Sequence, residues 1–170
     1  FSELSFCVLT ANWSAEGGIR AQKIIGKSNF AKLDYEELVK KLREVKHRYP
    51  ESRAKYIVEN RKLIGTLRNI WGLEIKEARK ILTKEAKGIG WKEASHFLRN
   101  SGKFDVAILD KHILRFLFKE EIIKEIPKYW TEKKYEEIEK EFKELSSLIN
   151  KTPGETDLYI WYFIKRKVEK

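Results

Sequence analysis

Cysteine is almost missing from this chain of 170 residues, which contains only Cys7. A single cysteine excludes an intrachain disulfide, a four-cysteine zinc site and a four-cysteine iron–sulfur cluster. Cys7 lies in the apolar run 6–9, where we expect a small core residue. The sequence therefore predicts no cofactor that depends on cysteine ligands.

Long apolar runs are also absent. No stretch approaches the roughly 20 residues that cross a bilayer, and no signal-peptide pattern opens the chain. We therefore expect a soluble, intracellular protein. The sequence has no methionine, not even an initiator. We expect from this a trimmed N-terminus, with one further helix missing before residue 1.

Glutamine occurs once, against 26 lysines and 22 glutamates, a bias typical of hyperthermophile proteins. With 42% hydrophobic and 12% aromatic residues the chain should fold, either as one domain or as two small helical lobes. Its 36 Lys and Arg exceed its 26 Asp and Glu, which leaves a net charge of +10. Such a surplus favours a polyanionic partner, either a nucleic acid or an anionic membrane.

Helical patterns dominate the rest of the chain, and its three prolines lie where one helix could end and another begin. Capping residues indicate helix starts at Asp34, Thr131 and Thr152. The period of residues 2–10 is ambiguous, and the only other strand candidate, 106–109, is too short to build a sheet. We predict an all-α fold with lobes at 1–118 and 119–170, the second completed by the missing N-terminal helix. We expect the helix after Thr131 to turn these residues inward: Tyr135, Ile138, Phe142, Leu145 and Leu148. We expect the last helix to carry Leu158, Trp161, Tyr162 and Ile164.

A glycine-containing turn joins two of these helical patterns within residues 74–100. Gly88 and Gly90 permit a tight hairpin, and a helix follows at once, so the segment is predicted to be a helix-hairpin-helix. The backbone N–H groups of Gly88, Ile89 and Gly90 would hold a DNA phosphate without reading sequence. The carbonyls of Ala86 and Ile89 would share a monovalent cation with that phosphate. The alternative is an ordinary corner between two helices.

Lys92 and Asp110 are the candidate catalytic residues. Lys92 falls in the first turn of a helix, where the helix dipole disfavours an ammonium group; partial burial would add to this and favour the free, nucleophilic amine. Asp110 follows the extended segment 106–109 and precedes another helical pattern, so backbone N–H groups would stabilise its carboxylate. The alternative role for Asp110 is that of a plain helix cap.

The hairpin, its lysine and the run 109–112 together resemble the helix-hairpin-helix glycine/proline-aspartate superfamily of DNA glycosylases. In that superfamily the hairpin lysine marks enzymes that are both glycosylases and AP lyases. Four separated blocks, 6–12, 15–20, 88–100 and 157–162, resemble the type-2 8-oxoguanine DNA glycosylases of archaea and some bacteria. This resemblance implies two helical lobes with a DNA-binding cleft.

The resemblance also implies a reaction. Lys92 would attack C1′ of the sugar of a base flipped out of the duplex, and the resulting Schiff base would permit strand nicking by β-elimination. Asp110 would stabilise the positive charge that develops on the sugar. The partner is double-stranded DNA containing 8-oxoguanine, no cofactor is required, and we expect a monomer at the nucleoid in the cytoplasm of a prokaryote.

Five further residues receive roles from the resemblance. His112 would contact a phosphate, and Asn12 would fill the gap that the flipped nucleotide leaves; their alternative roles are a half-exposed helix residue and a helix C-cap. Trp161 would stack on the extruded base, with a core tryptophan as the alternative. The terminal Lys170 would reach into the base pocket, where its carboxylate could accept from N7–H of 8-oxoguanine. Tyr49 is a weaker pocket candidate.

Two other functions stay open. The first is a glycosylase for another oxidised base, such as a pyrimidine, that uses the same Lys92 and Asp110. The second is a helix-hairpin-helix module that grips the DNA backbone without catalysis, in which Lys92 would supply only charge.

Overall fold

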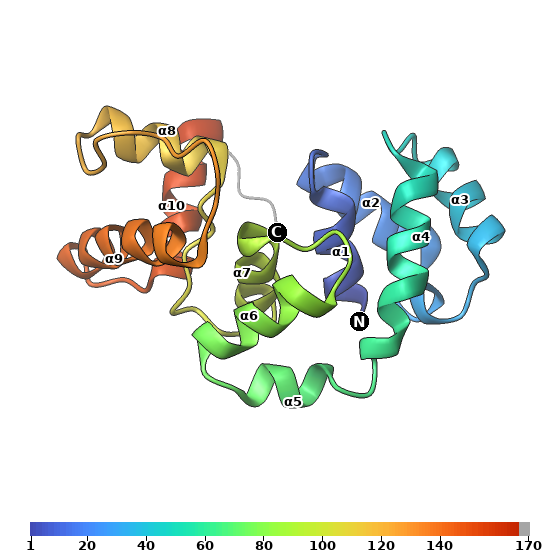
Figure 1. Cartoon of the computed structure of the whole chain (residues 1–170). Helices are drawn as coiled ribbons and strands as arrows, with labels where there is room; N and C mark the ends of the chain where they lie inside the picture. Colours follow the sequence, from blue (N-terminus) through green and yellow to red (C-terminus); the bar gives the residue numbers. More distant parts are fainter. Residues whose placement is uncertain (167–170) are drawn as a thin grey trace. The chain divides into compact units, whose positions relative to one another are not determined.

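The computed structural model describes residues 1–166, and across that range the chain is helical and contains no β-strand (Figure 1). This confirms the predicted all-α fold. The α-helices are α1 (Ser2–Thr10), α2 (Ala15–Ile25), α3 (Tyr35–Glu44), α4 (Pro50–Asn60), α5 (Leu67–Gly72), α6 (Ile75–Glu85), α7 (Trp91–Asn100), α8 (Lys111–Lys119), α9 (Glu132–Leu148) and α10 (Pro153–Lys165). Two short 3₁₀ turns, η1 (Asn29–Ala31) and η2 (Arg61–Leu63), complete the set.

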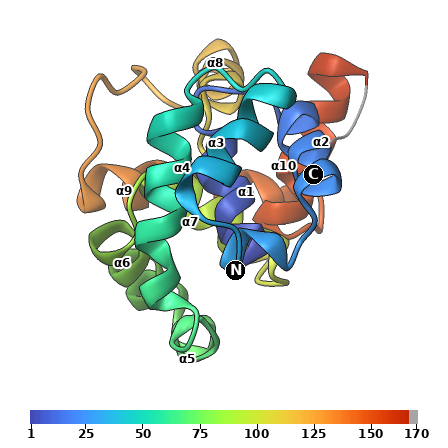
Figure 2. The same ribbon diagram turned by 90° about the vertical axis from the view of Figure 1, so that its right-hand side faces the viewer.

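The first of two compact units comprises Phe1–Phe97 and is built around α1. Helix α1 contacts α2 and α4, and α3 packs on α4 (Figures 1 and 2). Residues 4–10 of α1 are each at most 8% exposed, and Cys7 is a core residue as predicted. A helix buried on every side has no polar face, which explains why the hydropathy period of this segment is ambiguous.

The second unit comprises Leu98–Val168, described to residue 166. Helix α10 contacts both α8 and α9 within it. The division between the units falls inside α7, and the lobe boundary predicted near residue 119 lies within the second unit.

The segment 106–109 is buried and has no regular secondary structure, so it is not a strand. Two side chains of α9 supply the hydrogen bonds that a neighbouring strand would otherwise provide. Glu139 accepts from the N–H of Ala107 at 2.9 Å, and the Tyr135 hydroxyl donates to the Ala107 carbonyl at 2.8 Å. The segment can therefore cross the core alone and deliver Asp110 to the start of α8.

The predicted helix starts are confirmed. Asp34 caps α3 and Thr152 caps α10, each in a reciprocal capping box, and Thr131 caps α9. These signals are local in sequence, and the structure retains all of them.

One residue predicted to face inward is exposed. Leu148 is 82% exposed, because it lies only two residues after the last buried position, Ser146, and therefore on the opposite side of α9. Helix α10 contains Tyr162 and Ile164 as predicted, but both are exposed, because α10 buries a partly polar face that includes Thr156 and Asp157. Hydropathy alone cannot identify a buried face whose residues are polar.

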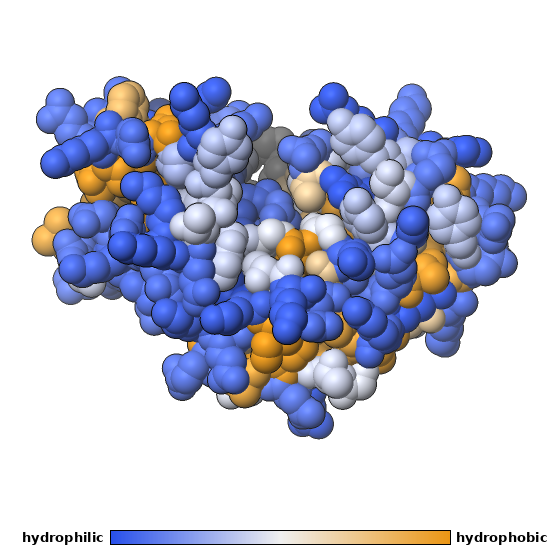
Figure 3. Space-filling view, in the orientation of Figure 1, coloured by the Kyte–Doolittle hydropathy of each residue, from blue (hydrophilic) through white to orange (hydrophobic). Residues whose placement is uncertain are grey.

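Hydrophilic residues cover most of the face that Figure 3 presents. Among the described residues, no helix has both the length and the apolar character that a membrane span requires.

Candidate active site

The glycine hairpin forms between α6 and α7, as predicted. Gly88 has a φ of +76°, and a Cβ placed there would lie 2.7 Å from Cδ2 of Tyr56. Both the backbone conformation and the close approach therefore require glycine. Ile89, between the two glycines, is buried. The hairpin presents its backbone at the start of α7, where the N–H groups of a first helical turn lack partners within the helix.

Lys92 lies in the first turn of α7, and its side chain is 28% exposed. Its Nζ is 2.9 Å from Oε1 of Glu93. The other carboxylate oxygen, Oε2, accepts from the N–H of Gly90 at 3.2 Å. Glu93 thus links the lysine ammonium to the hairpin backbone. Sequence reasoning missed this role, although a glutamate three residues after the hairpin glycine has the spacing of a capping box.

Asp110 is the N-cap of α8. Its Oδ1 accepts from the N–H groups of His112 and Ile113 at 2.8 and 2.9 Å, which fixes the orientation of the carboxylate. The cap predicted from sequence is therefore present. Asp110 belongs to the second unit, whereas Lys92 and the hairpin belong to the first.

His112 and Trp161 lie side by side in the second unit. Their ring centroids are 5.1 Å apart, with an interplanar angle of 64°. Burial lowers the pKa of His112, and the positive charges of Lys165, Lys111 and Arg115 act in the same direction, while Asp110 opposes them. The structure thus brings together the predicted phosphate contact and the predicted stacking residue. Trp161 is half-buried.

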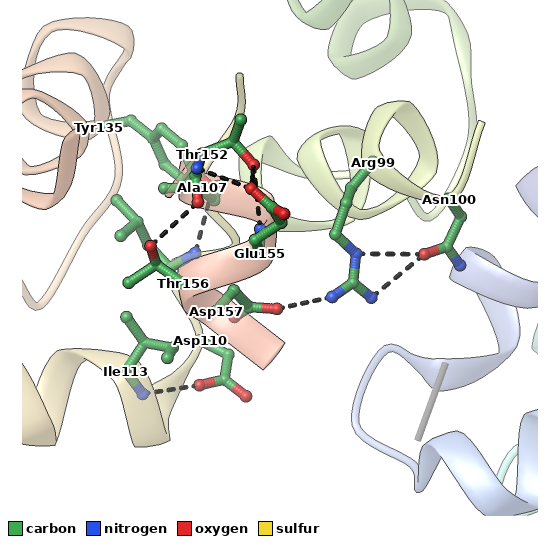
Figure 4. Close-up of polar contacts among 11 residues, drawn as sticks. Arg99, Asn100, Ala107, Asp110, Ile113, Tyr135, Thr152, Glu155, Thr156 and Asp157 are labelled. Atoms are coloured by element: carbon green, nitrogen blue, oxygen red, sulfur yellow. Dashed lines mark hydrogen bonds and ion pairs between the residues drawn. The ribbon is translucent and has the colours of Figure 1, made fainter. Parts of the chain in front are cut away.

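A second carboxylate, Asp157 on α10, lies close to Asp110 (Figure 4). It is 2% exposed, and its Oδ2 accepts from the guanidinium of Arg99 at 2.7 Å. Its Oδ1 is buried with no hydrogen-bond partner among the described residues. Burial raises the pKa of Asp157 to about 7; the negative charge of Asp110 contributes to this rise and the positive charge of Arg99 opposes it. Sequence reasoning missed the Asp157–Arg99 pair, because 58 positions separate the two residues along the chain.

Asn12 and Tyr49 both lie in the first unit. Asn12 is exposed and follows Ala11, the C-cap of α1, with a φ of +62°, a conformation that asparagine tolerates after a helix. Tyr49 is the N-cap of α4 and 39% exposed, with the guanidinium groups of Arg48 and Arg53 at 5.1 and 5.8 Å from its ring centroid. Lys170, the third candidate for base recognition, lies outside the described residues.

Among residues 1–166, no three His, Cys, Asp or Glu side chains gather as metal ligands. The monovalent cation expected at Ala86 and Ile89 would be held by backbone carbonyl oxygens rather than by such side chains. One of the two carbonyls between them in sequence, that of Lys87, accepts from the side chain of Asn60 at 2.9 Å. The cation itself stays a prediction.

Comparison with known proteins gives a consistent result. A family model described as 8-oxoguanine DNA glycosylase matches residues 1–151. The 8-oxoguanine DNA glycosylase/AP lyase of Thermotoga maritima is 58% identical over 170 residues, which is 100% of this chain and 82% of the relative.

Two solved structures are also similar. The crystal structure of the 8-oxoguanine DNA glycosylase of T. maritima has a TM-score of 0.96 at 57% identity, covering 99% of this chain and 81% of that one. The crystal structure of the Methanocaldococcus jannaschii 8-oxoguanine glycosylase/lyase in complex with DNA containing 8-oxoguanine has a TM-score of 0.93 at 48% identity. The match covers 99% of this chain and 82% of that one. The chain belongs to the helix-hairpin-helix 8-oxoguanine DNA glycosylase family.

Proposed function

We propose that this protein excises 8-oxoguanine from double-stranded DNA and nicks the strand through an AP lyase step. The observation that carries the proposal is the position of Lys92, in the first turn of the helix that directly follows the glycine hairpin. A hairpin that holds the DNA backbone there would bring a sugar to the lysine. The relatives named above carry the same pair of activities in their names.

Lys92 is the proposed nucleophile. Its free amine attacks C1′ of the flipped nucleotide, and the bond from C1′ to N9 breaks, with its electron pair leaving on the base, which takes up a proton. Opening of the sugar ring then gives a Schiff base between Nζ and C1′. Loss of a C2′ proton allows the C3′–O3′ bond to break, and the 3′ phosphate leaves, which nicks the strand.

Asp110 is the proposed electrostatic partner in this reaction. Its carboxylate is held by two backbone N–H groups of α8, so it would not need to reorganise when positive charge develops on the sugar. It would also assist the proton transfers that follow base release.

Base recognition is assigned to aromatic faces and a few polar groups. Trp161 would stack on the extruded base, and His112 beside it would contact a phosphate. Tyr49 is a second candidate for the pocket wall, and Asn12 would enter the gap in the duplex. Lys170 would also contribute to the base pocket, where an acceptor for N7–H favours 8-oxoguanine over guanine, which lacks this hydrogen. We further propose that a monomer acts at the nucleoid, in the cytoplasm.

Borohydride trapping tests the proposal. Borohydride reduces the Schiff base to a stable amine, so the wild-type protein should form a covalent adduct with a duplex containing 8-oxoguanine. Lys92→Gln should form none. Lys84→Gln is the matched control, because it removes the same charge at an exposed position in the last turn of α6 and should trap as wild type does.

The alternative functions predict different outcomes. A binding module would bind the duplex tightly, yet never trap or nick it. A glycosylase for another lesion would trap on duplexes containing an oxidised pyrimidine and ignore 8-oxoguanine. Either result would overturn the proposed substrate or the proposed chemistry.

A further inference from the structure

Helix α4 contains a buried amide that pairs with the hairpin backbone. Asn60, the last residue of α4, is 1% exposed. Its Oδ1 accepts from the N–H of Lys87 at 2.7 Å, and its Nδ2 donates to the carbonyl of the same residue at 2.9 Å. Because one planar amide engages both polar groups of Lys87, it fixes the peptide planes on either side of that residue. Gly88 follows immediately.

The same face of α4 contacts the hairpin at a second point. Tyr56, one turn before Asn60, places its ring where a Cβ on Gly88 would be. The hairpin is thus contacted at Lys87 by the amide of Asn60 and at Gly88 by the ring of Tyr56. Neither Tyr56 nor Asn60 belongs to the hairpin segment, so the geometry of the turn depends on α4.

A third residue on this face reaches the other segment proposed to contact DNA. The Arg53 guanidinium lies 5.7 Å from the Tyr56 ring centroid and donates to the carbonyl of Ala11 at 2.6 Å. Asn12 is the next residue. Positions 53, 56 and 60 follow helical spacing, so a single helix face holds both the Asn12 loop and the hairpin.

We propose that Asn60 is a positioning residue for DNA binding, which acts by holding the hairpin amides in the geometry that receives a phosphate. This inference rests on the proposed function only in assigning the phosphate to the hairpin. It requires no particular lesion and no chemistry at Lys92. A misaligned hairpin would weaken binding without removing any positive charge.

The test measures the affinity for an undamaged duplex, so that excision does not enter. Asn60→Leu keeps the approximate volume but loses both hydrogen bonds, and its Kd should rise about tenfold. Because no cation is lost, the slope of log affinity against log salt should stay that of the wild type. Ser52→Ala, at an exposed position on the same helix, is the control and should bind as wild type does.

Asn60→Asp provides the second variant. A carboxylate still accepts from the N–H of Lys87 but cannot donate to its carbonyl, so the rescue should be partial. Ser52→Asp adds the same charge to α4 at an exposed position and corrects for repulsion of DNA. We expect Asn60→Asp to bind more tightly than Asn60→Leu after this correction.

A purely structural role gives a different result. Loss of stability would lower the melting temperature and the fraction of active molecules, which a stoichiometric DNA titration measures, but the active molecules would keep the wild-type Kd. That result for both variants would overturn the proposal. If instead wild type binds duplex and never traps 8-oxoguanine, the proposed function fails while the binding data still decide the role of Asn60.

Discussion

At the scale of single residues, Asp110 has a capping role and a proposed catalytic role that one substitution can separate. Asparagine accepts the same two backbone hydrogen bonds as aspartate and is an equally good N-cap. Asp110→Asn should therefore melt within a few degrees of wild type, while single-turnover excision of 8-oxoguanine falls about 10²-fold or more.

Asp110→Ala is the comparison for this prediction. It removes the cap as well as the charge and should cost about 1 kcal/mol of stability. Retention of full excision by Asp110→Asn would show that the carboxylate is only a helix cap.

The raised pKa of Asp157 makes the free energy of unfolding depend on pH. Its pKa rises from an ordinary value of 3.8 to about 7 in the folded protein, mainly through burial. Between these two values the folded protein holds a proton that the unfolded chain has released, so this group makes the free energy of unfolding fall as pH rises from about 4 to about 7. Each pKa unit corresponds to about 1.4 kcal/mol.

Asp157→Asn removes this titration. Asparagine resembles the protonated carboxyl, so we expect the variant to match wild type near the acid end of that window and to gain stability relative to it as pH rises toward 8. Guanidinium unfolding at a series of pH values measures the difference. Parallel curves for the two proteins would mean that Asp157 is ionised throughout, with its charge balanced by Arg99.

At the scale of elements, the hairpin provides a test of backbone geometry. Gly88→Ala should destabilise the protein by about 1–2 kcal/mol, since alanine disfavours positive φ and its Cβ would meet the Tyr56 ring. The affinity for duplex DNA should fall with it. Gly65→Ala is the matched control, because no atom lies within 4 Å of its added Cβ. Thermal unfolding and duplex binding of both variants decide the point; equal effects would contradict a special role for Gly88.

The sequence predicts most of these elements because their signals are local. Asp34, Thr131 and Thr152 mark helix starts through contacts three residues away, and the structure shows each contact. The hairpin glycines and Lys92 are found in the same way, because their order along the chain defines the motif.

Residues whose roles depend on distant contacts are not found from sequence. Asn60 pairs with a residue 27 positions away, and Arg99 with one 58 positions away. Polar residues at such positions are usually solvent-exposed, and hydropathy gives no reason to bury them. The burial of Asp157 is an example, because the apolar residues of α10 do not indicate that its inward face includes a carboxylate.

At the scale of the whole molecule, the net charge of +10 predicts strongly salt-dependent DNA binding. Each phosphate neutralised by Lys or Arg adds about −0.9 to the slope of log affinity against log salt. With about four such contacts, the affinity for undamaged duplex should fall about 10²-fold between 50 and 200 mM salt. Fluorescence anisotropy at several salt concentrations measures the slope. A slope near zero would mean that the surplus charge serves another purpose.

The complete burial of Cys7 offers an experimental advantage. A thiol inside the core does not react with maleimide dyes in the folded state, so the folded wild-type protein should not be labelled. Lys84→Cys would introduce a unique reactive thiol, exposed in the last turn of α6 and close in sequence to the hairpin. A fluorophore at that position would report, in real time, when the hairpin engages DNA.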